Sequence, residues 1–299
     1  MIKCTKCNGP LHKNHSGYFC PNCNMTIPFQ DGILRFPSIG TNSEDHFPKD
    51  AFENLYKVEA NSFWFEVRNI IIGKTLQDYL PVRSRLIEVG CGTGFVSRYL
   101  KEIGYHVECG DLHLEGLQYC KERDAGEAYY QFNLQDPIFS EEYDAYCAFD
   151  VLEHLDDDER ALDNMYVGLK PGGFLFLTVP ACNAIWSYAD EYAGHKRRYS
   201  AKDLECKVRS AGFEVIRLTY FMTFLFPAIA LSRLLFRSNG RKQSSCQTEK
   251  GNRVMKELEL NPLLNTLFYH IFRMELPLIR RMDLPFGSSL LCVAVKKIH

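Results

Sequence analysis

Four cysteines near the start of the chain have the spacing of a metal site. Cys4 and Cys7 form one Cys-x2-Cys pair, and Cys20 and Cys23 form a second pair after twelve intervening residues. Two such pairs are typical of a ribbon-type zinc site, in which four thiolates surround the ion and leave no coordination position for chemistry. We therefore expect residues 1–38 to form a zinc ribbon whose folding free energy comes mostly from zinc binding. The alternative is four unrelated free cysteines.

Three glycines at every second position could bring a ligand close to the backbone. Gly90, Gly92 and Gly94 follow an apolar run, Arg85–Val89, that is typical of a buried strand, and apolar residues at helical spacing continue to Ile103. A strand, a glycine turn and a helix begin a nucleotide-binding type of α/β fold. The spacing is GxGxG, which differs from the GxGxxG of dinucleotide-binding proteins.

An acidic residue follows at the distance such folds use for a ribose. The segment from His106 to Gly110 is typical of a strand, and Asp111 comes directly after it. Nucleotide-binding folds place an acid about 20 residues after the glycines, where its carboxylate binds the two ribose hydroxyls. Alternatively, Asp111 caps a helix that begins near Leu114.

The motif E-x-G-x-G-x-G, from Glu88 to Gly94, resembles the first motif of the class I S-adenosylmethionine (SAM)-dependent methyltransferases. The segments YYQFNLQDPIF, YDAYCAFDVLEHLDD and LKPGGFLFLTVP resemble the later strands and loops of that family, in the same order. The pattern is similar to methyltransferase domains of types 11, 12 and 23 and to ubiquinone-pathway O-methyltransferases. It implies an α/β, Rossmann-like sheet of seven strands whose last strand is antiparallel. The segment CNMTIPFQDGILRFP resembles zinc ribbons of some bacterial methyltransferases and of a small methyltransferase activator protein.

The resemblance also implies which residues bind SAM. The turn from Gly90 to Gly94 holds the methionine half, with Glu88 near its amino end, while Asn133 meets the adenine and Leu134 packs on the ring. The implied cofactor-binding residues are Glu88, Gly90, Cys91, Gly92, Thr93, Gly94, Asp111, Leu112, Asn133, Leu134 and Asp150.

Transfer of a methyl group to a hydroxyl needs a base, because the oxygen must lose its proton as the new bond forms. The resemblance places His154 beside the methyl end of the cofactor, which makes it the first candidate, and His195 lies in the segment GHKRRY of the substrate loop. His154 could instead only orient its loop. Arg197 and Arg198 could hold an anionic substrate, such as a phosphate or carboxylate, or form a solvated face.

Other segments must position these residues. At 299 residues the chain can form one large domain, expected at residues 39–299, in addition to the ribbon. The segment FWFEVRNIIIGKTLQDYL predicts a helix that covers the cofactor pocket, and Ser200 is a predicted helix cap. By resemblance, Phe213–Tyr220 is the sixth strand, and SSLLCVAVKK is the seventh, between the fifth and the sixth.

A long apolar insertion, at about residues 221–286, separates these last two strands. Its first apolar run is too short for a membrane span of about 20 residues, and Pro227 and Arg233 interrupt it. It fits either an interfacial helix pair on a membrane or a lid over the active site, and in both cases it would select a partly apolar substrate. Its flanking basic residues are Arg233, Arg237, Arg241, Lys242, Arg280 and Arg281.

Charge and composition limit the classes of partner. The chain has 35 basic and 37 acidic residues, so nucleic acid is an unfavoured partner. The first residues lack a secretory signal, and we expect a protein that is cytoplasmic or peripheral at the inner face of the membrane. We therefore expect O-methyl transfer from SAM to a small-molecule or lipid-linked acceptor. An rRNA or tRNA methyltransferase and a non-enzymatic cofactor-binding scaffold are the alternatives.

Overall fold

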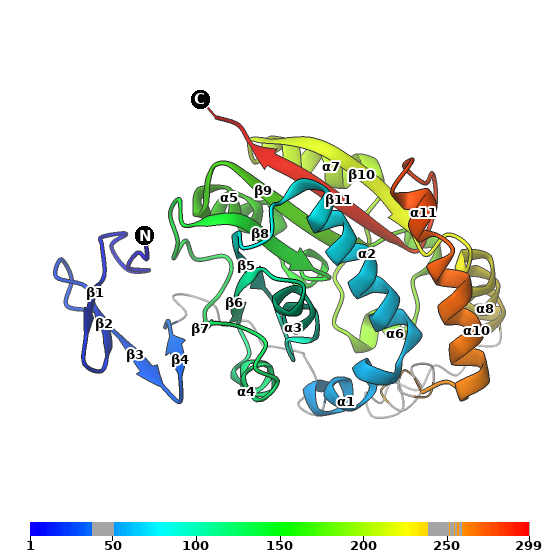
Figure 1. The fold of residues 1–299 in the computed structure, drawn as a ribbon, viewed down its shortest axis with the longest axis horizontal. Coiled ribbons are helices and arrows are strands. Elements are labelled where there is room, and N and C mark those ends of the chain that lie inside the picture. Colours follow the sequence, from blue (N-terminus) through cyan, green and yellow to red (C-terminus); the bar gives the residue numbers. More distant parts are fainter. Residues whose placement is uncertain (38–50, 239–250, 252–253, 255, 257–258, 299) are drawn as a thin grey trace.

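A computed structural model describes residues 1–37, 51–238, 251, 254, 256 and 259–298 (Figure 1). The expected boundary between the two domains, at residues 38 and 39, lies outside the described residues. One continuous β-sheet runs through the described chain, and helices cover its two faces (Figure 1).

Seven strands form the main part of this sheet, in the order β7-β6-β5-β8-β9-β11-β10. Their bounds are β5 Arg85–Val89, β6 His106–Asp111, β7 Ala128–Gln131, β8 Tyr143–Phe149, β9 Leu169–Pro180, β10 Phe213–Phe221 and β11 Ser289–Lys296. The first five of them run parallel, whereas β11 is antiparallel to both β9 and β10. This order confirms the predicted sheet and the place of its last strand.

The sheet has eleven strands, and the expectation of seven needs correction. The N-terminal segment adds β1 His12–Asn14, β2 Gly17–Phe19, β3 Thr26–Gln30 and β4 Ile33–Arg35. β4 pairs in parallel with β7, with Leu34 opposite Tyr130 and Arg35 opposite Gln131. Without β4, the strand β7 would present unpaired backbone groups at the edge of the sheet. The ribbon is therefore an extension of the larger sheet.

Helices form a layer on each face of the sheet. One layer contains α1 Ala51–Val58, α2 Phe63–Tyr79, α3 Phe95–Glu102 and α4 Leu114–Glu122, and the other contains α5 Asp158–Gly168 and α7 Ala201–Ser210. Alternate strand side chains point to the two layers and form two separate cores, for example Leu86 on one side and Ile87 on the other. The predicted cap is confirmed, because the Ser200 side chain accepts a hydrogen bond from the Asp203 amide.

Short elements lie in the connections between the longer helices and strands. They are the 3-10 helices η1 Glu59–Asn61, η2 Leu152–His154 and η3 Asn183–Ile185, and the helix α6 Tyr188–Tyr192. Glu59 of η1 and His154 of η2 line the cavity described below.

The insertion forms α8 Phe226–Ser238, α10 Pro262–Arg273 and α11 Leu276–Ile279. α10 packs on the start of α2, where the Phe63 ring lies 5.5 Å from that of Phe268. The Asn265 side chain accepts a hydrogen bond from the Phe63 amide at 2.9 Å and donates one to the Asn61 carbonyl at 3.0 Å. Among the described residues, the helices are too short or too polar to span a bilayer. The predicted flanking residues Arg241 and Lys242 and the Arg237 side chain lie outside the described residues.

Candidate active site

A cavity of about 480 Å³ lies at the carboxyl ends of the parallel strands β5 to β8. This volume is within the range of small-molecule sites, and this edge of the sheet is where α/β folds bind ligands. The predicted residues that line it are Glu88, Gly90, Cys91, Gly92, Thr93, Asp111, Leu112, Asn133, Leu134, Asp150, His154 and His195. The described residues of the insertion do not line this cavity, so they give no support to the lid alternative.

The three glycines of the turn have different functions. Gly90 has φ +66°, and a Cβ there would lie 2.5 Å from Val151. Gly92 has φ +51°, and the nearest described atom to its Cβ would be in Phe52, at 3.9 Å, which leaves bare backbone facing the cavity. A Cβ on Gly94 would lie 2.5 Å from the Cys120 sulfur on α4. Gly94 therefore permits close helix packing, and its predicted contact with the cofactor is not supported.

Two buried carboxyl groups lie on the cavity wall. Asp111 accepts hydrogen bonds from the backbone amides of Gly92 and His113, each at 2.8 Å. His113 is the N-cap residue of α4 and, in the described chain, no side chain caps this helix, so the alternative that Asp111 caps it is wrong. Glu88 accepts a hydrogen bond from the Ser97 hydroxyl, and burial raises the pKa of Glu88 to about 8.

The turn is tied to the first helical layer by a residue that the sequence patterns did not indicate. The Thr93 hydroxyl donates to the buried Glu59 carboxylate at 2.5 Å, and Arg123 donates to the same oxygen at 2.8 Å. On the opposite wall, the Asn133 side chain accepts from the Gln135 amide at 2.9 Å and fixes the loop after β7.

The structure brings the two predicted histidines together. The rings of His154 and His195 meet edge to face, with centroids 4.9 Å apart. Asp190 Oδ1 lies 2.9 Å from His195 Nδ1 and accepts a hydrogen bond from Arg198 at 2.7 Å. On the other side of the ring, Glu153 Oε1 lies 3.9 Å from His195 Nε2. His195 is therefore held between two carboxyl groups.

Burial sets the charges of this cluster. Burial, and then the neighbouring His195, lower the pKa of His154 to about 3, so His154 is neutral near pH 7. Burial alone would raise the pKa of Asp190, but its hydrogen bonds with His195 and Arg198 lower it to about 2. Glu153 is fully buried, its carboxyl oxygens have no hydrogen-bond partner among the described residues, and burial raises its pKa well above the usual range. Asp190 is therefore ionised near pH 7.

The basic cluster in GHKRRY pairs with acids of the chain itself. The guanidinium group of Arg197 lies 3.0 Å from the Asp158 carboxylate, and that of Arg198 lies 2.7 Å from the Asp190 carboxylate. These ion pairs neutralise the two guanidinium groups, and neither arginine lines the cavity. The alternative in which Arg197 and Arg198 hold an anionic substrate is therefore not supported.

A buried cation that the sequence reasoning missed does line the cavity. The guanidinium group of Arg68, on α2, lies 2.6 Å from Asp150 and 5.0 Å from the centre of the Trp64 ring. A single arginine within the apolar segment FWFEVRNIII was the available signal. Arg68 fixes the position of Asp150, one of the predicted cofactor-binding residues.

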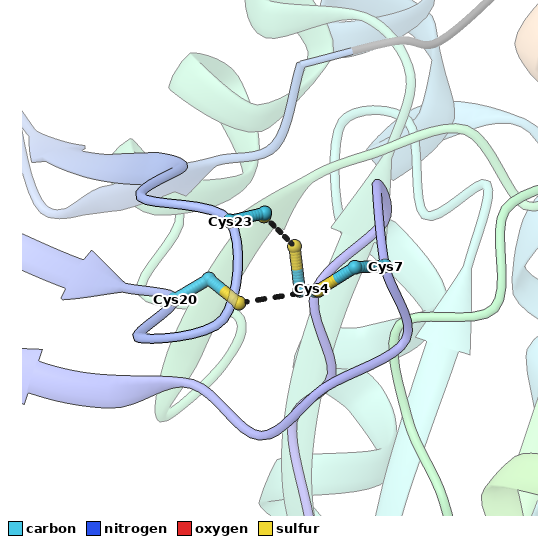
Figure 2. Close-up of side chains that lie close together, drawn as sticks. All are labelled: Cys4, Cys7, Cys20 and Cys23. Carbon is cyan, nitrogen blue, oxygen red and sulfur yellow. Dashed lines mark hydrogen bonds between the residues drawn. The ribbon is translucent and has the colours of Figure 1, made fainter.

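The four N-terminal cysteines converge at one point (Figure 2). The sulfurs of Cys4 and Cys23 lie 3.5 Å apart, those of Cys7 and Cys20 lie 3.3 Å apart, and all four lie within 4.8 Å of one another. Tetrahedral zinc with Zn–S bonds of about 2.3 Å holds its sulfurs about 3.8 Å apart. The four thiols therefore fit a structural zinc site.

Comparisons with known proteins agree with this geometry. Residues 66–218 match a family described as a methyltransferase domain. The malonyl-acyl-carrier-protein O-methyltransferase of Enterobacter lignolyticus is 28% identical over 133 residues, which cover 42% of this chain and 53% of that protein. The ubiquinone biosynthesis O-methyltransferase of Xylella fastidiosa is 30% identical over 112 residues, or 34% of this chain and 46% of that protein. The chain thus spans about half the length of these curated relatives.

A solved structure supports the fold. Phosphoethanolamine N-methyltransferase 2 of Haemonchus contortus in complex with SAM has a TM-score of 0.56 at 17% sequence identity, over 85% of this chain and 59% of that one. The matched family covers just over half of the 299 residues, and the strand order and the cavity agree with it. The chain therefore belongs to the class I SAM-dependent methyltransferase family.

Proposed function

We propose that this protein transfers a methyl group from SAM to a hydroxyl oxygen of a small-molecule or lipid-linked acceptor. The observation that carries the proposal is the contact between Asp190 and His195, because His195 lines the same cavity as Gly92 and Asp111. Bound SAM supplies an activated methyl group on a sulfonium. The two relatives whose names specify O-methyl transfer support oxygen as the accepting atom.

In the proposed reaction, His195 accepts the acceptor's proton at Nε2. The ionised Asp190 accepts a hydrogen bond from Nδ1, which leaves Nε2 as the basic nitrogen and stabilises the imidazolium that forms. SAM, when bound, would supply the methyl group to the acceptor oxygen and leave as a neutral thioether, and His195 would keep the proton that the oxygen loses. The enzyme mainly aligns the reacting atoms.

His154 has a different proposed function. Its lowered pKa makes it a weak base, and its ring packs edge-on against His195. We therefore propose His195, in place of His154, as the first candidate for the base. We assign His154 to positioning the ring of His195. The cavity is also lined by Trp64, Phe65 and Leu155, which favour an acceptor with an apolar or aromatic part.

Two further proposals concern the rest of the chain. The four cysteines hold one structural Zn²⁺, which fixes the ribbon against β7. The enzyme acts in the cytoplasm, with a peripheral site at the inner face of the membrane for a lipid-linked acceptor.

The test uses SAM with a labelled methyl group, the purified protein and a cell extract, followed by separation of protein, RNA, aqueous and organic phases. Label in the aqueous or organic phase that is lost in His195→Ala supports the proposal. Label in RNA would show an RNA methyltransferase. SAM binding without label in any phase would show a non-enzymatic scaffold.

A further inference from the structure

The solvent face of α10 is apolar, although exposed helix faces are normally polar. Leu263 and Leu267 of α10 and Met274, which directly follows the helix, are 82%, 52% and 62% exposed and lie at helical spacing, with the exposed His270 between them. Phe272, on the opposite face of this helix, is fully buried in the core. α10 thus has one apolar face for the protein and a second one, the leucine face, that points outward.

Within Leu260–Arg281 the exposed charges have one sign, whereas the exposed Glu259 precedes this segment and Asp283, after it, pairs with Arg217 at 3.0 Å. From Leu260 to Arg281 the sequence contains three arginines and one acid, Glu275, which is fully buried. Arg273 and Arg281 are exposed, whereas Arg280 pairs with Asp78 at 2.7 Å. An outward surface that combines leucine with arginine is complementary to anionic lipid, which offers negative headgroups above an apolar layer.

The leucine face is also connected to the active site. Asn265, on the same helix, holds the first turn of α2, and Trp64 and Arg68 of α2 line the cavity. In Figure 1, α10 and α8 lie at the end of the molecule opposite the N-terminal ribbon. The ribbon would therefore not obstruct contact between α10 and a membrane.

We propose that the leucine face of α10, with Arg273 and Arg281, docks the protein on an anionic lipid surface. This inference deepens the proposed function, because it places an apolar acceptor in the membrane next to the cavity, and its link to catalysis rests on that function. A second copy of the chain is a less suitable occupant. A symmetric dimer through this face would bring the same arginines together without acidic partners on the segment.

The test is co-sedimentation of the full chain with vesicles of phosphatidylcholine, alone or mixed with phosphatidylglycerol. The variant Leu263→Gln/Leu267→Gln removes apolar contact from exposed positions, and Arg281→Gln removes a charge. Val82→Gln is the matched control, because Val82 is a 58% exposed apolar residue in the loop between α2 and β5, outside the leucine face. The assay needs neither SAM nor turnover. Vesicle binding can therefore fail while methyl transfer succeeds, and methyl transfer can fail while vesicle binding succeeds.

We expect the wild type and Val82→Gln to bind the mixed vesicles, with binding that decreases as salt increases. Each Leu→Gln change should weaken partition by about tenfold, and Arg281→Gln should weaken it only on the anionic vesicles. The proposal is overturned if the wild type stays in solution or if the double leucine variant binds equally well. It is also overturned if light scattering without lipid detects a dimer that the leucine variant abolishes.

Discussion

The Asp190 carboxylate lies 2.9 Å from Nδ1 of His195, in the segment that joins α6 to α7. Arg198 donates to the same carboxylate oxygen, so a single acid fixes both the imidazole ring and the loop around it. Glu153, whose pKa is raised by burial, faces the other ring nitrogen. The contact with Asp190 therefore distinguishes His195, the proposed base, from its buried neighbour His154.

Replacing His195 by alanine should lower kcat while SAM affinity is retained. Loss of a positioned base usually costs about 10²–10⁴-fold in rate, and His195 is expected to contact the acceptor. Turnover of labelled SAM and calorimetric titration with SAM measure the two effects separately. If both fell to the same extent, His195 would be a residue that builds the pocket.

Asp190→Asn should also lower kcat, because an amide cannot stabilise the imidazolium as a carboxylate does. We expect a loss of about tenfold or more, together with a changed pH–rate profile and an unchanged SAM affinity. A variant with unchanged kcat and pH profile would limit Asp190 to a structural role in holding Arg198.

The affinity for SAM should increase with pH. Burial raises the pKa of Glu88 to about 8, so the carboxyl is mostly protonated below that value and becomes ionised as the pH rises. If ionised Glu88 pairs with the amino group of SAM, affinity should increase by about tenfold between pH 6 and pH 7.5. Titrations at several pH values check this slope, and Glu88→Gln should remove it. A slope that persists in the variant would assign the effect to another group.

Substitution of two glycines should separate cofactor binding from folding. Gly92→Ala has space for its Cβ but points into the cavity, so it should weaken SAM binding and cost about 1–2 kcal/mol for the left-handed backbone. Gly94→Ala would force its Cβ against Cys120, so it should cost about 3 kcal/mol or more. Urea unfolding and SAM titration distinguish the two. Equal effects on both measurements would contradict the assignment of Gly94 to packing.

Removal of zinc should affect the sheet as well as the ribbon. The purified protein should contain one zinc per chain, and Cys4→Ser should lose the metal and several kcal/mol of stability, of the order found for structural metal sites. Because β4 pairs with β7, next to Asn133, SAM affinity should also fall. Metal analysis and thermal unfolding check this, with the exposed Cys206→Ser as control. Retained zinc in Cys4→Ser would exclude the four-thiolate site.

The sequence predicted the local features correctly. Apolar runs identified the strands β5 and β6, and glycine spacing identified the turn after β5, because both signals arise from neighbouring residues. The five later strands came from resemblance to a family. The two Cys-x2-Cys pairs identified the four thiols that converge in the structure for the same reason. The order of the strands came from resemblance to a family, since no local pattern specifies which strands pair.

The tertiary structure decided the features that depend on which distant segments meet. The pairing of β4 with β7 joins residues about a hundred positions apart, and nothing in Ile33–Arg35 indicates its partner. Burial lowers the pKa of His154, whereas its sequence position had made it the first candidate base. Asp190 belongs to the site because a short helix turns it toward His195. Patterns in the sequence indicate the structural propensity of a segment. Burial, the charge state of a buried group and the exposure of the leucines of α10 depend instead on which faces are covered in the folded chain.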